Sequence, residues 1–148
     1  MYKPEYQVKY DKQLIGAEFI PLREGMKTIG YTYTANKKIL TIKQRDFYEK
    51  GFNFSHDGKF YRYSSSILNN TEIRPVPADT IRGDTIYNYG LMYRDEEDGF
   101  KIKFILVIQC DWKFTIPAFI YSQILPKGAK DFHDNICKFY QKNYSKVV

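Results

Sequence analysis

The sequence contains few side chains arranged for catalysis. His56 falls in a predicted hairpin turn and His133 on a polar part of the last predicted helix, and neither adjoins a nucleophile motif. Glu49 and Arg62 are the exception: if both face inward on neighbouring strands, they form a buried ion pair. Because two buried charges lose their hydration, such a pair demands good geometry. Glu49 with Arg62 is therefore the candidate around which an enzyme acting in a cavity would be built.

Metal and nucleotide chemistry have little support in the sequence. The carboxylates from Asp95 to Asp98 crowd one tight turn, whereas a calcium loop spreads alternate ligands along a longer one. No glycine-rich phosphate loop is present. Cys110 and Cys137 have no CxxC spacing and are expected to stay reduced. We expect no metal site, no cofactor and no catalytic residue.

Composition fits one globular domain over residues 1–148. The chain has 14 tyrosines and 11 phenylalanines, which favour strands and can line an apolar cavity. Its net charge of +6 suits an anionic membrane surface or nucleic acid, although such a charge is common. A nucleic-acid-binding sheet would need outward aromatics flanked by lysines. The strongest aromatic faces are instead predicted to point at the last helix, so we expect no nucleic-acid partner.

No apolar run is long enough to cross a bilayer, and the N-terminal residues lack the apolar core of a signal peptide. We therefore expect a cytoplasmic protein that lies peripheral to membranes.

Period-2 patterns predict a β-rich chain of about six antiparallel strands. The expected strands span residues 14–22, 28–34, 46–54, 60–68, 85–93 and 101–111. Residues 6–10 alternate weakly and predict an edge strand or a lead-in. The unbroken apolar run from Phe104 to Ile108 predicts a buried strand.

Apolar residues at helical spacing predict one helix from Ile116 to Tyr140, about 37 Å long, with Pro117 in its first turn. Pro126 and Gly128 predict a kink or a break. Its apolar stripe, with Phe119, Ile120 and Ile136 inward, is expected to lie on the sheet. The fold class is α+β.

Several short motifs occur in a recognisable order. Arg45-Asp46-Phe47 opens a strand, and YRYSSSI follows on its partner. TIRG ends a proline-containing loop, and CDWKFTIPAFI leads into the last helix. Tyr10-Asp11 resembles a Trp-Asp pair that opens the middle strands. Together these resemble the START domain, the steroidogenic acute regulatory protein-related lipid-transfer domain.

The resemblance implies a helix-grip fold, in which a curved antiparallel sheet wraps around a long C-terminal helix. A lipid-sized tunnel lies between them, and the family binds one lipid without catalysis. Only about nine residues precede Tyr10, where START domains carry a helix, three strands and further helices. We therefore expect either a fragment or an N-terminally shortened domain that closes its sheet differently. Loss of those strands leaves a sheet edge exposed, which favours a homodimer.

The resemblance also implies lipid-contact residues. Phosphatidylcholine-binding members hold choline in an aromatic cage, as cation–π attraction favours. The family's phosphate-binding arginines are replaced by Gln7 and Gly51, and Arg62 is the substitute that the sequence offers. We expect a phospholipid such as phosphatidylcholine ahead of a sterol, with a helix-grip enzyme as a further alternative. The predicted contacts are Asp11, Tyr31, Tyr33, Phe47, Glu49, Arg62, Tyr87, Phe119, Ile120 and Ile136.

The loops at residues 35–44 and 69–83, with the last helix, are expected to form the gate of the tunnel. In the second loop, Ile73 and Val76 are predicted to dip into a membrane interface. Arg74 and Arg82 are predicted to meet anionic head groups during transient contact with the membrane.

Overall fold

The computed structural model describes residues 4–38, 42–98, 101–115 and 118–144, and it does not describe the side chains of residues 4, 5, 118–121, 123–125 and 144. Two helices, α1 and α3, begin and end the described chain, with seven strands and a short helix between them. In chain order the elements are α1 (Pro4–Tyr10), β1 (Leu14–Pro21), β2 (Ile29–Asn36), β3 (Gln44–His56), β4 (Lys59–Ser66), α2 (Asn70–Ile73), β5 (Thr80–Arg82), β6 (Asp84–Arg94), β7 (Ile102–Asp111) and α3 (Ala118–Tyr144).

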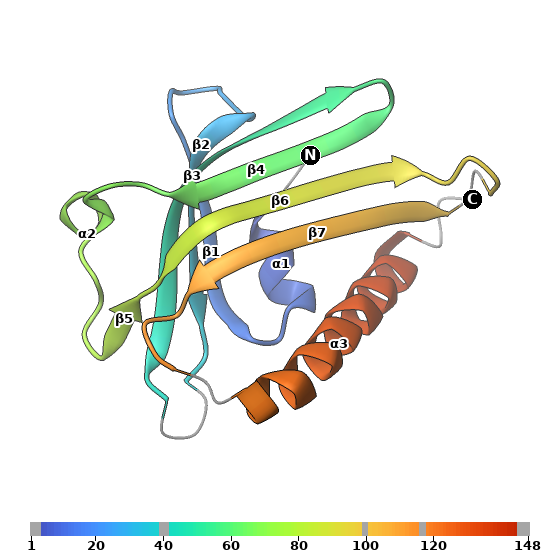
Figure 1. Ribbon diagram of the computed structural model, residues 1–148. Coiled ribbons are helices and arrows are strands. Elements are labelled where there is room, and N and C mark those ends of the chain that lie inside the picture. Colours follow the sequence, from blue (N-terminus) through green and yellow to red (C-terminus); the bar gives the residue numbers. More distant parts are fainter. Residues whose placement is uncertain (1–3, 39–41, 99–100, 116–117, 145–148) are drawn as a thin grey trace.

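The strands form one curved sheet in the order β1-β2-β3-β4-β6-β7, and all neighbours in this order are antiparallel. β5 pairs in parallel with the start of β3. Figure 1 shows the curvature of the sheet and the long helix α3 that lies beside it. The predicted α+β class and helix-grip architecture are confirmed. β5 is an addition, because the sequence predicted residues 69–83 as a loop without regular structure.

The N-terminal segment is a helix, so the predicted edge strand at residues 6–10 is wrong. Pro4 suits the first helical turn, where a missing N–H costs nothing. The amide of Asp11 donates to the carbonyl of Gln7 over 2.7 Å and closes the last turn. α1 packs on α3 through aromatic rings, with Tyr10 and Phe132 centroids 5.9 Å apart and Tyr10 and Phe139 centroids 5.8 Å apart.

α3 continues through Pro126 and Gly128, so of the predicted kink or break the break is wrong, and the kink stays a prediction. The start expected at Ile116 and Pro117 lies outside the described residues. None of the described side chains of α3 is buried, and Ile136 is half-buried. The helix therefore contributes little to the core over the part that the structure describes.

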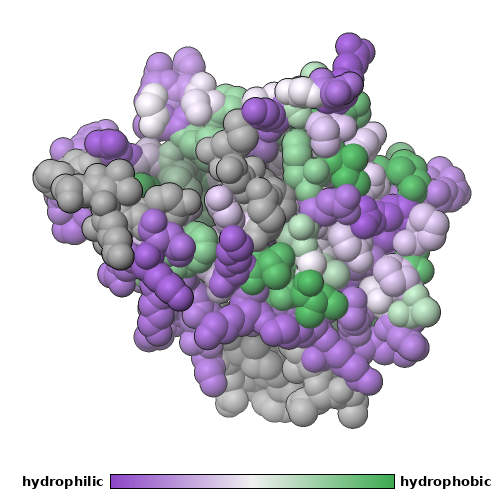
Figure 2. Space-filling view, turned by 180° about the vertical axis from the view of Figure 1, so that it is seen from behind, coloured by the Kyte–Doolittle hydropathy of each residue, from purple (hydrophilic) through white to green (hydrophobic). Residues whose placement is uncertain are grey.

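β7 is an edge strand, and the prediction that its apolar run is buried is wrong. Its side chains from Phe104 to Ile108 are between 39% and 49% exposed on both faces. The strand pairs only with β6, and no described side chain of α3 is buried against it. Seen from behind, the molecule also presents apolar patches between hydrophilic side chains (Figure 2). An unbroken apolar run therefore marked an exposed edge here rather than a covered strand.

Candidate functional site

Strand alternation sorts the side chains of the sheet into two faces. β2 and β3 pair so that Thr32 lies opposite Glu49 and Tyr33 lies opposite Tyr48. Since neighbouring residues along a strand point to opposite sides, Glu49 and Tyr48 belong to different faces. We call the face of Glu49 the inner face and that of Tyr48 the outer face.

A buried polar cluster lies on the inner face. Glu49 is 6% exposed, and its two carboxylate oxygens accept hydrogen bonds from neighbouring strands. The Ser64 hydroxyl donates to Oε2 over 2.5 Å, and the Thr85 hydroxyl donates to Oε1. Cys110 Sγ lies 3.6 Å from Thr85 Oγ1. We call these four residues the Glu49 cluster.

The thiol of Cys110 in this cluster is a weak nucleophile, which reacts slowly. Burial raises its pKa, the hydrogen bond with Thr85 lowers it, and the negative charge of Glu49 raises it. Since the net shift is upward, the thiol is protonated at neutral pH and is a weak nucleophile. Its position makes it useful as a reporter of what covers the inner face.

Two buried oxygens near the cluster have no hydrogen-bond partner among the described residues: Asn53 Oδ1 and Asn88 Oδ1. Asn53 lies opposite Arg62, and Asn88 lies opposite Ser64, so the two amides flank β4 on the inner face. An unsatisfied buried acceptor costs about 1–3 kcal/mol. A ligand hydroxyl or ammonium group that donated to either oxygen would recover part of that cost.

Beyond these amides the inner face becomes apolar. Arg62 lies opposite Gly90, and Gly90 lies opposite Leu106, which places Leu106 on the inner face. The exposed apolar side chains of β6 and β7 on this face are Met92 at 37%, Leu106 at 39%, Phe104 at 45%, Ile108 at 49% and Ile102 at 64%. The inner face therefore joins a buried polar end to an open apolar stretch.

The predicted aromatic cage does not assemble. Phe47 lies on the inner face, whereas Tyr31, Tyr33 and Tyr87 lie on the outer face. Tyr31 stacks on Tyr48 with ring centroids 5.4 Å apart. The prediction matched aromatic residue types at the expected positions, but it did not test which face each strand position occupies.

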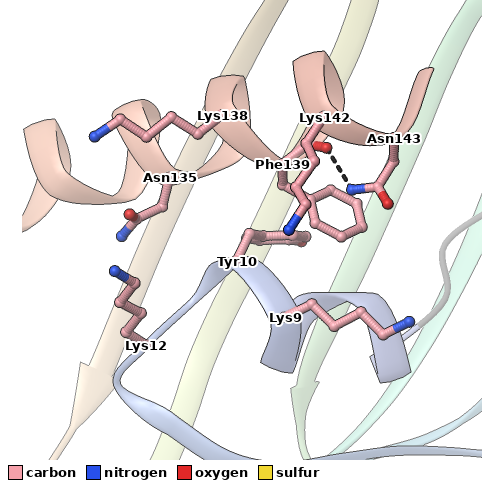
Figure 3. Close-up of a pocket in the computed structure, with 8 residues that line it drawn as sticks. All are labelled: Lys9, Tyr10, Lys12, Asn135, Lys138, Phe139, Lys142 and Asn143. Atoms are coloured by element: carbon pink, nitrogen blue, oxygen red, sulfur yellow. Dashed lines mark hydrogen bonds between the residues drawn. The ribbon is translucent and has the colours of Figure 1, made fainter. Parts of the chain in front are cut away.

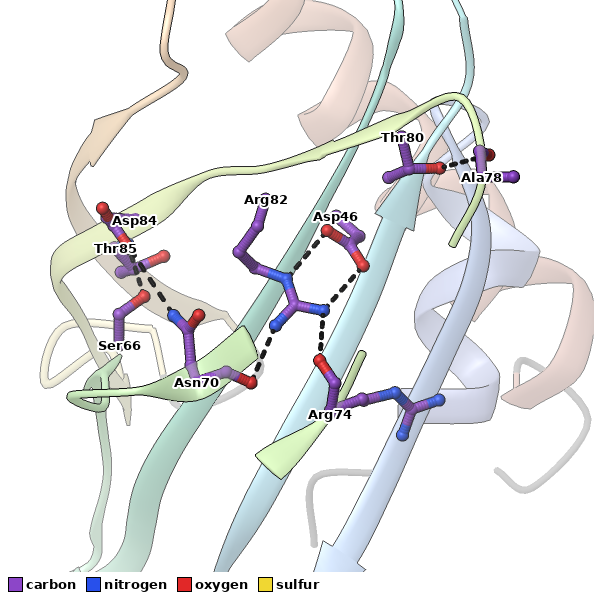
Figure 4. Close-up of polar contacts among 9 residues, drawn as sticks. All are labelled: Asp46, Ser66, Asn70, Arg74, Ala78, Thr80, Arg82, Asp84 and Thr85. Atoms are coloured by element: carbon purple, nitrogen blue, oxygen red, sulfur yellow. Dashed lines mark hydrogen bonds and ion pairs between the residues drawn. The ribbon is translucent and has the colours of Figure 1, made fainter. Parts of the chain in front are cut away.

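The tripeptide Arg45-Asp46-Phe47 holds neighbouring segments to the sheet, and we call these three residues the lock. Asp46 is fully buried, and its two carboxylate oxygens accept from Arg82 over 2.8 and 3.0 Å. The Arg82 guanidinium also donates to the carbonyls of Asn70 and Arg74, each over 3.2 Å (Figure 4). One buried ion pair thus fastens the loop at residues 69–83 to β3 from the outer face.

The other two residues of the lock hold the segment between β7 and α3. Arg45 donates from Nε to the carbonyl of Trp112 over 3.1 Å. The Phe47 and Trp112 rings meet edge to face with centroids 5.2 Å apart. Gly83 lies against the Phe47 ring so closely that a Cβ would overlap it. The motif therefore joins the loop at residues 69–83 and Trp112, which follows β7, to the start of β3.

Because the lock fastens the loop at residues 69–83, not all of its predicted membrane contacts are available. Arg82 is 7% exposed and bound to Asp46, so the prediction that it meets head groups is wrong. Arg74 is paired with Glu18 over 2.9 Å and lies over the Tyr33 ring, 3.8 Å from its centroid. Burial, followed by the negative charge of Asp46, raises the pKa of Tyr33. Ile73 is 56% exposed in α2, and Val76 is half-buried.

Glu49 and Arg62 share the inner face but not a row of the sheet. Glu49 lies opposite Ser66, and Arg62 is four residues further along β4, about 13 Å at the usual rise. The Glu49 carboxylate is bonded instead to Ser64 and Thr85, which no sequence spacing predicted. A Cβ at Gly51 would come within 2.5 Å of the Tyr63 carbonyl oxygen, so the sheet leaves no room there for the arginine of the family pattern.

The remaining predicted contacts lie apart from the cluster. Asp11 follows α1, where its Oδ1 accepts from the Gln13 amide over 3.0 Å, and it lines a hollow of about 340 Å³ beside Phe132 of α3. The side chains of Phe119 and Ile120 lie outside the described residues, as do residues 39–41 of the first predicted gate loop.

Within the described chain, no three His, Cys, Asp or Glu side chains come close enough together to hold a metal ion. Cys110 and Cys137 are both free. None of the described helices is long and apolar enough to cross a bilayer.

No protein-family model and no curated protein matches this sequence. Solved structures do match the fold. Human StAR-related lipid transfer protein 5 matches with a TM-score of 0.76 at 17% identity, over 92% of this chain and 64% of that one. Human STARD10 matches at 0.73 and 17% identity, over 98% and 60%.

The lipid transfer and protein localization domain of human StarD13 matches with a TM-score of 0.72 at 14% identity, over 91% of this chain and 66% of that one. The chain thus spans about two thirds or less of each structure. The curved sheet, its strand order and the C-terminal helix are those of the START helix-grip fold, and this chain has that fold.

Proposed function

We propose that this protein binds a single lipid against the inner face of its sheet and transfers it between membranes. The observation that carries the proposal is the gradient along that face, from the Glu49 cluster and the unpartnered amides to exposed apolar side chains. A lipid has the same two ends, one polar and one apolar. Pockets for such ligands are mostly apolar with a few placed polar groups.

The polar end favours a ligand that donates a hydrogen bond. Glu49 is an acceptor already supplied by two hydroxyls, and Asn53 Oδ1 and Asn88 Oδ1 are acceptors still without a donor. A sterol offers one hydroxyl donor on a rigid apolar body. The geometry therefore supports a sterol ahead of the phosphatidylcholine that the motif positions had suggested.

Phosphatidylcholine remains the second candidate because of Arg62. This cation lies on the inner face beside the apolar stretch, where it is the charged group best placed for a phosphate. With the aromatic cage split between faces, choline would gain no cation–π contact from Tyr31, Tyr33 or Tyr87. Phosphate would have to supply the recognition.

Transfer of a fluorescent sterol between neutral vesicles tests the proposal. Asn88→Leu removes an acceptor that has no hydrogen-bond partner among the described residues, so we expect the folded variant to keep or gain stability. Its sterol transfer is expected to fall about tenfold, the equivalent of one hydrogen bond. Gln109→Leu, which alters an exposed amide on the outer face of β7, is the matched control and is expected to change neither.

The outcomes separate the candidates. Transfer of phosphatidylcholine but not of sterol, lost in Arg62→Gln, would support the second candidate. If a folded sample took up neither lipid, the proposal would be wrong.

Cys110 locates the bound lipid independently. In a Cys137→Ser background, alkylation at pH 8–9 is expected to slow when the protein is loaded, since a lipid on the inner face covers the Glu49 cluster. An unchanged alkylation rate in a loaded sample would place the lipid elsewhere.

A further inference from the structure

A second concave site lies between the two terminal helices, away from the Glu49 cluster. The cleft has a volume of about 480 Å³. Its floor is aromatic, formed by Tyr10 of α1 and Phe139 of α3. Its other lining residues are Lys9, Lys12, Asn135, Lys138, Lys142 and Asn143. No carboxylate of the described residues lines it.

The four lysines of this cleft come from two segments that are distant in the sequence. Figure 3 shows the Lys12 and Lys142 side chains directed toward the cleft, from below and from above. In the same view Lys9 and Lys138 point away to its two sides. The arrangement is therefore a pair of inward ammonium groups with two more cations at the rim.

These charges are not used to hold the described part of the protein together. The lysines that form ion pairs in the described chain are Lys101, Lys103, Lys113 and Lys130. Lys9 lies over the Tyr6 ring at 4.8 Å, and none of the four cleft lysines forms an ion pair with a described carboxylate. Three acids, Asp11, Asp131 and Asp134, line the adjoining hollow, which Lys12 and Lys138 line as well. Asp134 is bound to Lys130 over 2.6 Å.

We propose that the α1–α3 cleft binds the phosphate groups of anionic phospholipids at a membrane surface and so holds the protein there during lipid exchange. Two inward ammonium groups suit phosphate oxygens, and the two rim lysines add attraction toward a negatively charged surface. Asn135 adds an amide group beside them, whereas the Asn143 amide nitrogen donates to the Phe139 carbonyl over 2.7 Å. This docking role rests on the proposed transfer function but uses residues separate from the inner face.

Co-sedimentation with vesicles tests the cleft directly. The full chain is mixed with vesicles of phosphatidylcholine alone or with phosphatidylserine added, at several salt concentrations. Lys12→Glu with Lys142→Glu is compared with Lys27→Glu plus Lys127→Glu, two exposed lysines outside the cleft. Both double variants carry the same net charge, so a difference between them reports position rather than total charge.

We expect wild type to bind the anionic vesicles and the cleft variant to bind them at least about 30-fold more weakly, at roughly fivefold per lysine lost. The control pair is expected to lose much less. Equal losses in both variants, or full binding by the cleft variant, would overturn the proposal. Lys12→Gln with Lys142→Gln repeats the test if charge reversal prevents folding.

Two further experiments distinguish a membrane phospholipid from a free polyphosphate, and the docking role of the cleft from lipid transfer. Inositol hexakisphosphate is expected to compete with the vesicles only weakly; if it bound tightly and vesicles did not, the cleft would be a site for a free polyphosphate and the membrane role would be wrong. Sterol loading and Cys110 protection are expected to be unchanged in the cleft variant. Failure of lipid loading in wild type would refute the transfer function, while vesicle binding would still report on the cleft.

Discussion

At the scale of single residues, the face of the sheet to which each side chain points determined which sequence predictions were correct. Glu49 is buried, and its hydrogen-bond partners are Ser64 and Thr85 rather than Arg62. Tyr31 and Tyr33 had the right type for a cage but point the other way. A period of two makes every such assignment depend on register, and a sequence alone gives register poorly.

The buried ion pair between Asp46 and Arg82 gives a stability prediction. Asp46→Ala leaves the Arg82 guanidinium buried without its counter-charge, and we expect a loss of about 3–5 kcal/mol in the free energy of unfolding. Urea denaturation measures it. Glu24→Ala, in the exposed turn after β1, is the control and should stay within about 0.5 kcal/mol. A loss below about 1 kcal/mol for Asp46→Ala would show that the pair is not a lock.

Asp11 gives a pH prediction of known sign. Burial raises the pKa of Asp11, although the Gln13 amide and Lys37 lower it in part. A carboxyl group with a raised pKa in the folded state favours folding when protonated, so its ionisation destabilises the protein as pH rises.

Asp11→Asn keeps the oxygen that accepts from the Gln13 amide but cannot ionise. The variant is therefore expected to be more stable than wild type at pH 7, and the difference should shrink as pH falls toward the ordinary value of 3.8. Urea denaturation at pH 7 and pH 4.5 checks the trend. A larger advantage at the lower pH would contradict the assignment.

At the scale of elements, most strands and the last helix were predictable because their hydrophobic periods are long and regular. α1 was missed because PEYQVKY is short and alternates weakly, while its helix depends on aromatic packing against the distant Phe132 and Phe139. β5 was missed because three residues are too few to show a period. Parallel pairing with β3 and the ion pair of Arg82 with Asp46 hold it in place. β7 was found but misplaced, since an apolar run indicates a strand without showing what covers it.

The exposed edge strand β7 predicts self-association. Among the described residues its backbone groups on one side have no partner strand, and its side chains are exposed on both faces. Such an edge tends to pair with another chain, and lysines on the edge suppress that pairing.

Ile105→Lys with Val107→Lys, both on the outer face of β7, is therefore expected to reduce the dimer fraction in analytical ultracentrifugation. Ile86→Lys is the control, because Ile86 is also exposed but lies in β6, which has a partner strand on both sides. Wild type that stays monomeric at high concentration would contradict the prediction.

At the scale of the whole molecule, the fold separates three tasks. The lock, Arg45 with Asp46 and Phe47, holds Trp112 and the loop at residues 69–83 to the sheet. The inner face has a polar end and an apolar stretch, and the α1–α3 cleft gathers four lysines. Motif order was enough to predict the helix-grip fold. It did not predict the unpartnered amides or the cleft, because each is assembled from segments far apart in the sequence.

The central claim is that one lipid molecule occupies the inner face. A native mass spectrum of the full chain, purified and then incubated with vesicles that contain both sterol and phosphatidylcholine, tests it most directly. The account predicts one adduct per chain, with the mass of a single lipid, and identification of that lipid after extraction. A folded protein that carries no lipid adduct, or a ladder of several lipids that does not saturate at one, would contradict it.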